Sequence, residues 1–434
     1  MVFPAMSSQT VTEAATVVDK ASVLQIPAQV RTAVAAMAAL LLLTNLSPSW
    51  GAEGGSNLFR QIAFTLLFLV AAAATLPLRN LARLFVVPAS LVVALGWCWL
   101  STTWAVDPGT TLRRIILTTM IIWSVFLMVE LAGSLRTIAT MRACSVAALV
   151  VNYLMVLAAP SIGVHGYEVM DPSLVGDWRG FTPSKNFAGA VCALTVIMFM
   201  LGAPLRSQGG RAGVVVAALV FLYKSDSATS QGMLLLAVGA GWVFRRYNPD
   251  YRAFFIPAVM IAGVIVVLGL LMSRSFFEAL SSSRTAFTGR IQIWNALIRY
   301  SEDNLWFGSG YGSFWNIGGE SPIFRYARGW VAETITSGHN GYLDLLAQVG
   351  IPGLALVLFA ALVLPLVKLL SSRTLPRGDG SLIMAIVLFV AGHNLTESSL
   401  FERDVVTQVY LILAIALLAQ HTGRLASSAP ATTS

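Results

Sequence analysis

His339 and Asn340 stand directly before a long apolar run, within TSGHNGYLDLLAQVGIPGLALVLFAALVLPLVKLL from Thr336 to Leu370. An imidazole titrates near neutral pH and can take a proton from a substrate hydroxyl. Other polar segments carry cations that can stabilise a negative charge that grows during a reaction. These are Arg179, Lys185, Arg284 and Arg290. A histidine with several cations nearby is typical of a site that binds an anion.

The segment WRGFTPSKNFAG could bind an anion where a helix begins. Ser184 or Asn186 can cap the helix, Lys185 lies at the same start, and Arg179 stands six residues upstream. Free N–H groups, the helix dipole and two cations together attract negative charge. The alternative is an ordinary capped membrane span whose cations reach toward water.

The longest polar segment runs from Ser273 to His339 and contains Arg284 and Arg290 in SSRTAFTGRIQIW. Apolar residues recur with helical spacing from Gly289 to Tyr300, and FGSGYGSFW then ends the pattern. No strand precedes these glycines, so they do not predict a dinucleotide site. A glycine turn that lets a ligand or a backbone approach closely is the better interpretation.

Aromatic residues crowd the same segment, among them Trp294 and Tyr311, and are interleaved with Arg325 and Arg328. Such rings can lie at the headgroup level of any membrane protein. They can also form platforms for sugar rings and an extended polar ligand, and both interpretations stay open.

Asn340 can cap a helix, and Asp344 would then lie in its first turn, where a negative charge suits the dipole. We expect a short helix over Gly341 to Val349 on the outer surface, a break at GIPG, and Pro352 in the first turn of the next span. This structural account leaves His339 unexplained, so we assign the histidine to chemistry.

The elements that position these residues are transmembrane helices. Of 434 residues, 56% are hydrophobic and 11% charged, and the mean hydropathy is +0.75. Repeated apolar runs near the length needed to cross a bilayer predict an all-α polytopic membrane protein. We expect about 12 spans: Val30–Leu46, Gln61–Leu76, Leu84–Leu100, Ile115–Leu131, Ser145–Ala159, Phe187–Leu201, Ala212–Leu222, Gln231–Phe244, Phe254–Met272, Ile351–Leu370, Leu382–Ala391 and Val405–Ala419.

Basic residues set the orientation, because short cytoplasmic loops are enriched in Lys and Arg. The even-numbered loops and both termini carry 15 basic and 5 acidic residues, against 13 and 15 on the other side. Both termini are therefore predicted to be cytoplasmic, and the net charge of +8 does not indicate a nucleic-acid partner. The three cysteines, all in apolar runs, fit no metal pattern.

The motifs GRIQIW, NLWFGSGYGSFW and HNGYLDLLAQVGIPGL closely resemble the O-antigen ligase and Wzy-type polysaccharide polymerase superfamily. The strong resemblance covers residues 289 to 354. WRGFTPSKN and NLTES extend it and are most similar to the exopolysaccharide polymerase (ExoQ-like) branch. PSKN stands where many relatives have His-Lys-Asn, so no histidine role is assigned there.

The resemblance implies a GT-C-type, inverting, metal-independent glycosyltransferase without a cofactor. It would act at the periplasmic face of the bacterial inner membrane, with a glycan on undecaprenyl diphosphate as donor. A polymerase uses the next lipid-linked repeat as acceptor, whereas a ligase uses lipid A–core. The resemblance also implies membrane lipid and, as further partners, a flippase and a chain-length regulator.

We therefore assign His339, Arg290 and Glu397 to catalysis, with Asp344, Glu333 or Glu397 as the partner or substitute of the histidine. The remaining candidates would bind substrate: Arg179, Lys185, Asn186, Arg284, Trp294, Tyr311, Arg325, Arg328, Asn340 and Asp344. A transporter is the alternative class, but the sequence shows no internal repeat and almost no charge at span centres.

The predicted organisation has five parts. They are a cytoplasmic tail (1–29), spans 1–9 (30–272), a large late periplasmic loop with short helices and the catalytic motifs (273–350), spans 10–12 (351–419) and a second cytoplasmic tail (420–434).

Overall fold

The computed structural model describes residues 26–47, 58–75, 85–167, 172–202, 207–259, 261 and 289–427. Long helices dominate these ranges, and their only strand-like feature is an isolated bridge between Val164 and Trp178. The helices are α2 (Ala28–Leu46), α3 (Leu58–Thr75), α4 (Ala89–Leu100), α5 (Pro108–Ala132), α6 (Ser134–Ala158), α7 (Pro160–Gly163), α8 (Lys185–Met200), α9 (Gln208–Lys224), α10 (Ala228–Arg246), α13 (Arg290–Asp303), α14 (Ile323–Tyr326), α15 (Trp330–Thr334), α16 (Gly341–Leu358), α17 (Leu364–Ser371), α18 (Arg377–His393) and α19 (Val406–Ser427).

Six helical segments within the described ranges are long and apolar enough to cross a membrane, which confirms an all-α membrane protein. They are α2, α3, α5, α6, the continuous segment from α16 through α17, and residues 406–423 of α19. Helices α4 and α8 are apolar but shorter. Twelve spans and the GT-C architecture stay predictions, and most of the predicted span Phe254–Met272 lies outside the described residues.

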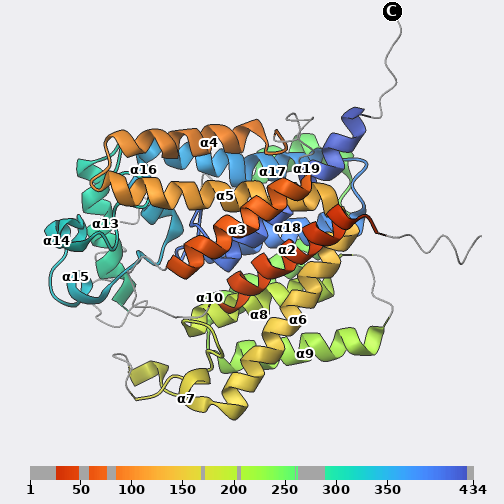
Figure 1. Cartoon of the computed structure of the whole chain (residues 1–434), viewed down its shortest axis with the longest axis horizontal. Coiled ribbons are helices and arrows are strands. Elements are labelled where there is room, and N and C mark those ends of the chain that lie inside the picture. The colour runs from red at the N-terminus through yellow and green to blue at the C-terminus, as the bar shows by residue number, and fades with distance from the viewer. Residues whose placement is uncertain are drawn as a thin grey trace, which may run out of the picture.

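The middle of the bundle consists of α8, α18 and α19, whose side chains are buried along almost their whole length. Helix α10 packs against α18, α19 packs against α5, and α3 lies beside α5 (Figure 1). Helix α3 also carries many exposed apolar side chains, as expected for a face in contact with lipid.

The polar loop before α16 has a small core of its own. In Figure 1, α13, α14 and α15 form a group at one end of the long helices α4 and α5. Leu297, Phe314, Ile323 and Val331 belong to this second core, which also contacts α16 through Ala347. The candidate motifs are therefore carried by a packed subdomain.

Several boundaries differ from the sequence prediction, most clearly those of α6 and α19. The segment GSLRTIATMR was expected to be a loop, but α6 already begins at Ser134. Gly133, at φ 78°, ends α5 and precedes α6 directly, so no loop is needed. Arg142 fits this helix because it donates to the carbonyls of Met198 and Leu201 at the end of α8. Helix α19 continues to Ser427, into the predicted cytoplasmic tail.

The expected break at GIPG is present. Gly350 has φ 67° and ψ −176° inside α16, which divides the helix into 341–349 and a second part that contains Pro352 in its first turn. A side chain at Gly350 would meet the Trp306 carbonyl, so the kink and the close approach of the 305–307 backbone both require glycine.

Candidate active site

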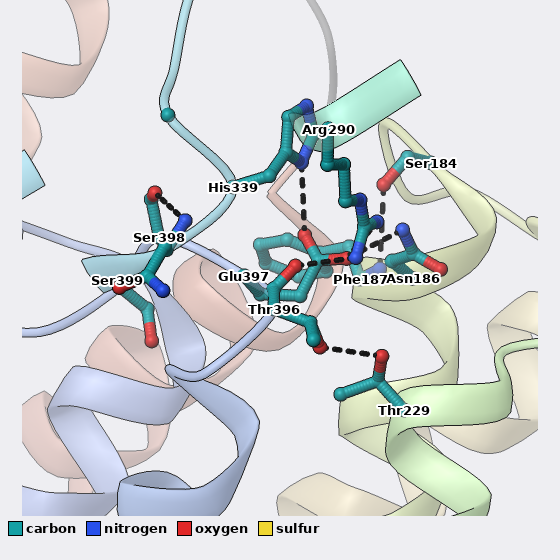
Figure 2. A network of polar contacts seen from close by, with 12 residues as sticks. Ser184, Asn186, Phe187, Thr229, Arg290, His339, Thr396, Glu397, Ser398 and Ser399 are labelled. Carbon is teal, nitrogen blue, oxygen red and sulfur yellow. Dashed lines mark hydrogen bonds and ion pairs between the residues drawn. The ribbon is translucent and has the colours of Figure 1, made fainter. Parts of the chain in front are cut away.

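Glu397, in the loop between α18 and α19, is the centre of a polar network that joins four parts of the chain (Figure 2). Its Oε1 accepts hydrogen bonds from Arg290 Nη2 at 2.6 Å and from Asn186 Nδ2 at 2.7 Å. Its Oε2 lies 3.4 Å from His339 Nδ1. Residues separated by as many as 211 positions in the sequence thus meet at one carboxylate.

The carboxylate is ionised although it is largely buried, with 14% of its side chain exposed. Burial alone would raise the pKa of Glu397, but the hydrogen bond from His339 and the charge of Arg290 together hold the pKa below its usual range. An ionised carboxylate can only accept, so Nδ1 of His339 carries the hydrogen. In the neutral ring Nε2 is then the basic nitrogen, as in a histidine–carboxylate pair that takes a proton.

Arg290 is fixed by the same loop. It is the first residue of α13, and its Nη1 donates to the Thr396 carbonyl at 2.5 Å. The Thr396 hydroxyl in turn shares a hydrogen bond with Thr229 of α10 at 2.7 Å (Figure 2). A guanidinium has five N–H groups, so the two bonds to this loop leave donor capacity for an anionic substrate.

His339 has a strained backbone, with φ 48° in the left-handed region. This conformation costs a residue other than glycine about 1–3 kcal/mol and persists only where its surroundings impose it. Here Gly338 is held on both sides: its N–H donates to Asp344 and its carbonyl accepts from Trp294 Nε1 at 3.0 Å. The strained backbone conformation of His339 therefore occurs at the residue whose imidazole contacts Glu397.

Asp344 is bonded within the protein in a way that suits a positioning role, and its assignment to substrate binding stays a prediction. It is buried, and it accepts hydrogen bonds from Trp315 Nε1 at 2.6 Å, from the Gly338 N–H at 2.9 Å and from Ser398. It stabilises the turn before His339 and the loop after Glu397. Of the three predicted partners of His339, the structure brings Glu397 to the ring, whereas Glu333 is exposed on α15.

Asn340 caps α16 as predicted, since its Oδ1 accepts from the N–H groups of Tyr342 and Leu343 at 3.1 Å each. Its own N–H donates to Ser398 Oγ at 3.1 Å and its Nδ2 to the Leu395 carbonyl. All these partners are parts of the protein and Asn340 is buried, while its assignment to substrate binding stays a prediction.

The start of α8 is organised differently from the simplest prediction. Ser184 is the cap, accepting from the Phe187 N–H at 3.3 Å, whereas the Asn186 side chain points to Glu397 (Figure 2). Lys185 pairs with Asp177 at 2.8 Å and lies 3.8 Å from Asp226. Arg179 donates to the Ile162 carbonyl.

The charges around this site are balanced. The described cations are Arg179, Lys185 and Arg290, and the carboxylates are Asp177, Asp226 and Glu397. A diphosphate would therefore draw Lys185 and Arg290 partly away from carboxylates that already hold them. Arg284, the fourth predicted cation, lies outside the described residues.

Two of the aromatic residues predicted to bind substrate are buried. Trp294 is buried in the second core, with its indole N–H bonded to the Gly338 carbonyl. Tyr311 is buried between helices, and its hydroxyl donates to the Phe401 carbonyl at 2.6 Å. Neither ring has a face for a sugar. Arg325 and Arg328 are exposed on the segment around α14 and α15, where their assignment to substrate binding stays a prediction.

The sequence interpretation missed several residues that hold the site together. Asp177 neutralises Lys185 from eight residues upstream, and Ser398 follows Glu397 directly within NLTESS. These two could have been found by extending the motifs already chosen. Thr229 and Trp315 had no sequence signal, because their contacts depend on how distant segments pack. No group of three His, Cys, Asp or Glu side chains suited to a metal occurs in the described part of the chain.

Comparison with known proteins gives one family match, over part of the chain. Residues 212–358 match a family model described as O-antigen ligase. No curated protein matches the sequence. The matched region contains Arg290 and His339, whereas Asn186 and Glu397 lie outside it. The resemblance to the O-antigen ligase and Wzy-type superfamily is thereby confirmed.

Proposed function

With residues 212–358 matching the O-antigen ligase family, we propose that the protein is a glycosyltransferase that moves a glycan from undecaprenyl diphosphate to a sugar hydroxyl. The observation that carries the proposal is the contact of His339 and Arg290 with one ionised carboxylate, Glu397. This places a base and a cation within the same small site.

The reaction begins at the acceptor hydroxyl, a poor nucleophile that needs a base. Nε2 of His339 takes its proton while the hydroxyl oxygen bonds to the anomeric carbon of the donor. The anomeric carbon–oxygen bond breaks, and its electron pair leaves with the lipid diphosphate. A single displacement inverts the anomeric centre and requires no protein nucleophile.

Negative charge grows on the diphosphate as that bond breaks. Arg290 can donate to it, and Lys185 is the neighbour in the sequence of Asn186, whose side chain contacts Glu397. Charge-assisted donors held in place before the reaction stabilise such a leaving group without a metal ion. Glu397 keeps Arg290 and His339 oriented and stabilises the imidazolium that forms.

The acceptor defines two candidate activities. Our first proposal is a polymerase that uses the next lipid-linked repeat, because WRGFTPSKN and NLTES resemble the exopolysaccharide polymerase branch. A ligase acting on lipid A–core is the second candidate, and the description of the matching family model favours it. We place either reaction on the periplasmic face of the bacterial inner membrane, with both termini cytoplasmic.

Deletion of the coding sequence followed by glycolipid analysis separates the two activities. Single repeats accumulating on the lipid carrier would identify a polymerase. Long polymer on the carrier, together with bare lipid A–core, would identify a ligase. Unchanged glycolipids would reject both.

Purified protein tests the chemistry directly. His339→Ala and Arg290→Ala should each lower the rate of glycan transfer by about 10²–10⁴-fold while the protein still inserts into membranes, and the exposed Glu333→Gln serves as the control. Transfer should survive EDTA, whereas loss restored by Mg²⁺ would contradict the metal-independent scheme.

A further inference from the structure

A second group of charged residues lies at the far end of the loop that carries Glu397. It consists of Arg60 from α3, Arg113 and Arg114 from α5, and Arg403 from the α18–α19 loop, which we call the outer arginine cluster. Three carboxylates accompany it: Asp107, Glu402 and Asp404. Unlike the site around His339, this group has more cations than carboxylates.

Fixed contacts hold the cluster together. Arg60 forms an ion pair with Asp404, and Arg403 pairs with Glu402 at 2.7 Å. Burial alone would raise the pKa of Glu402, but Arg403 and Arg114 hold the pKa below its usual range, so Glu402 stays ionised. Glu402 and Asp404 are thus each already paired with an arginine.

With four arginines and three carboxylates, the cluster has one positive charge in excess, and Arg113 and Arg114 are the arginines that hydrogen-bond to neutral groups. Arg114 donates to the carbonyls of Gly312 and Trp315, and Arg113 donates to the Thr110 hydroxyl at 3.1 Å. All of these acceptors are neutral. Asp107 caps α5 by accepting from the N–H and hydroxyl of Thr110; these bonds, with a smaller contribution from the charge of Arg113, lower the pKa of Asp107.

The cluster is accessible and lies beside a surface suited to lipid. Arg113 is exposed, and about a third of the Arg403 side chain is exposed (31%). Phe59 and Leu112, the neighbours of Arg60 and Arg113 in the sequence, are also exposed. Helices α3 and α5 pack side by side, so cations and apolar side chains occur together where a charged headgroup meets hydrocarbon.

Polymerisation requires such a site, which makes the inference depend on the proposed function. The donor diphosphate leaves from the reacting anomeric carbon. The acceptor reacts through a hydroxyl that is separated from its own diphosphate by the sugars of one repeat. Its diphosphate must therefore bind away from Arg290, although both carriers are anchored in the same leaflet.

The α18–α19 loop limits the distance between the Arg290–His339 site and the outer arginine cluster. Glu397 and Glu402 are five residues apart, so their Cα atoms lie within about 18 Å of each other even in a fully extended chain. We propose that the outer arginine cluster binds the diphosphate of the lipid-linked acceptor, while the Arg290–His339 site holds that of the donor. Arg113 makes the main accessible contact.

Acceptor kinetics test this assignment in the full-length protein in proteoliposomes. Arg113→Ala should raise KM for the lipid-linked acceptor about 10-fold, with kcat and the donor KM unchanged, because one charge-assisted contact is lost. Arg113→Lys should recover much of the affinity. Arg31→Ala, an exposed arginine at the start of α2, is the matched control and should behave as wild type. An unchanged acceptor KM in Arg113→Ala would overturn the assignment.

Native mass spectrometry with undecaprenyl diphosphate gives a test that needs no turnover. Wild-type protein should bind two molecules, and Arg113→Ala should bind the second about 10-fold more weakly. Phosphatidylglycerol in excess should not displace the second undecaprenyl diphosphate from the wild-type protein. A single bound molecule, or equal displacement by phosphatidylglycerol, would reject a second diphosphate site. If either of these two binding results occurs while the wild-type protein transfers glycan normally, only the second diphosphate site is rejected. A wild-type protein that transfers no glycan would reject the proposed function.

Discussion

Replacing Glu397 by glutamine tests how the site is organised, because the change keeps the shape of the side chain and removes its charge. The carboxylate accepts from Arg290, Asn186 and His339. The glutamine carbonyl oxygen can still accept from Arg290 and Asn186. Its NH₂ group can only donate, so the bond from His339 Nδ1–H is lost and the ring is free to adopt the other tautomer.

The structure sets the expected magnitudes. Side-chain exposure at the Arg290–Glu397 pair is only 15% and 14%, so solvent screens it weakly. A hydrogen bond to a charged group contributes about 1.5–3 kcal/mol and a neutral one about 0.5–1.5, so we expect Glu397→Gln to cost about 1–2 kcal/mol of stability. Loss of an oriented base should lower kcat by about 10²–10⁴-fold.

The assay measures glycan transfer and thermal unfolding on the same purified samples. The exposed Glu333→Gln controls for a change of one carboxylate in the same region and should match wild type in both measurements. A Glu397→Gln protein with wild-type kcat would refute the role of this carboxylate in orienting the histidine, whatever its stability.

Three other perturbations have defined outcomes. The Glu397 pKa is depressed in the folded protein, so the ionised carboxylate stabilises the fold above its ordinary pKa of 4.5, and this contribution is lost as the pH falls through the lower folded pKa. The unfolding free energy of the wild type should therefore fall more steeply below about pH 4.5 than that of Glu397→Gln. Parallel slopes would contradict this. Asp344→Asn weakens the hydrogen bonds that hold the turn before His339, so stability should fall by about 1–3 kcal/mol and kcat should fall with it in transfer assays, whereas full activity would show that the turn needs no such support. Gly350→Ala forces a side chain onto the Trp306 carbonyl at a positive φ and should lower the unfolding free energy by about 2 kcal/mol or more. Gly213→Ala, in open space on α9, should be neutral or stabilising in the same unfolding measurement. Equal effects of the two substitutions would argue against the kink at Gly350.

Much of the architecture was predictable because burial in a bilayer leaves a strong pattern in the sequence. Continuous apolar runs identified α2, α3, α5 and α19, and turn chemistry identified the cap at Asn340 and the kink at Gly350. Local signals did not reveal the start of α6, because helices tolerate arginine and Gly133 joins α5 to α6 without a loop.

The site was predictable in its residue types and only partly in its contacts. His339 and Arg290 stood out as polar groups in a functional position, and Glu397 was chosen beside them. That Lys185 would be neutralised by Asp177, or that Trp294 would be buried, depends on side-chain directions set by packing between distant segments. The helix dipole already explains an acidic residue at position 344, so the sequence gives no separate signal for the hydrogen bonds of Asp344 with Gly338 and Trp315.

A double-mutant cycle between His339 and Glu397 tests the central claim, that the carboxylate acts through the histidine. Single-turnover transfer rates would be measured for wild type, His339→Ala, Glu397→Gln and the double variant. If the two side chains act as one unit, the double variant should be no slower than His339→Ala alone. Losses that multiply in the double variant would show that the two residues act independently and would contradict the account.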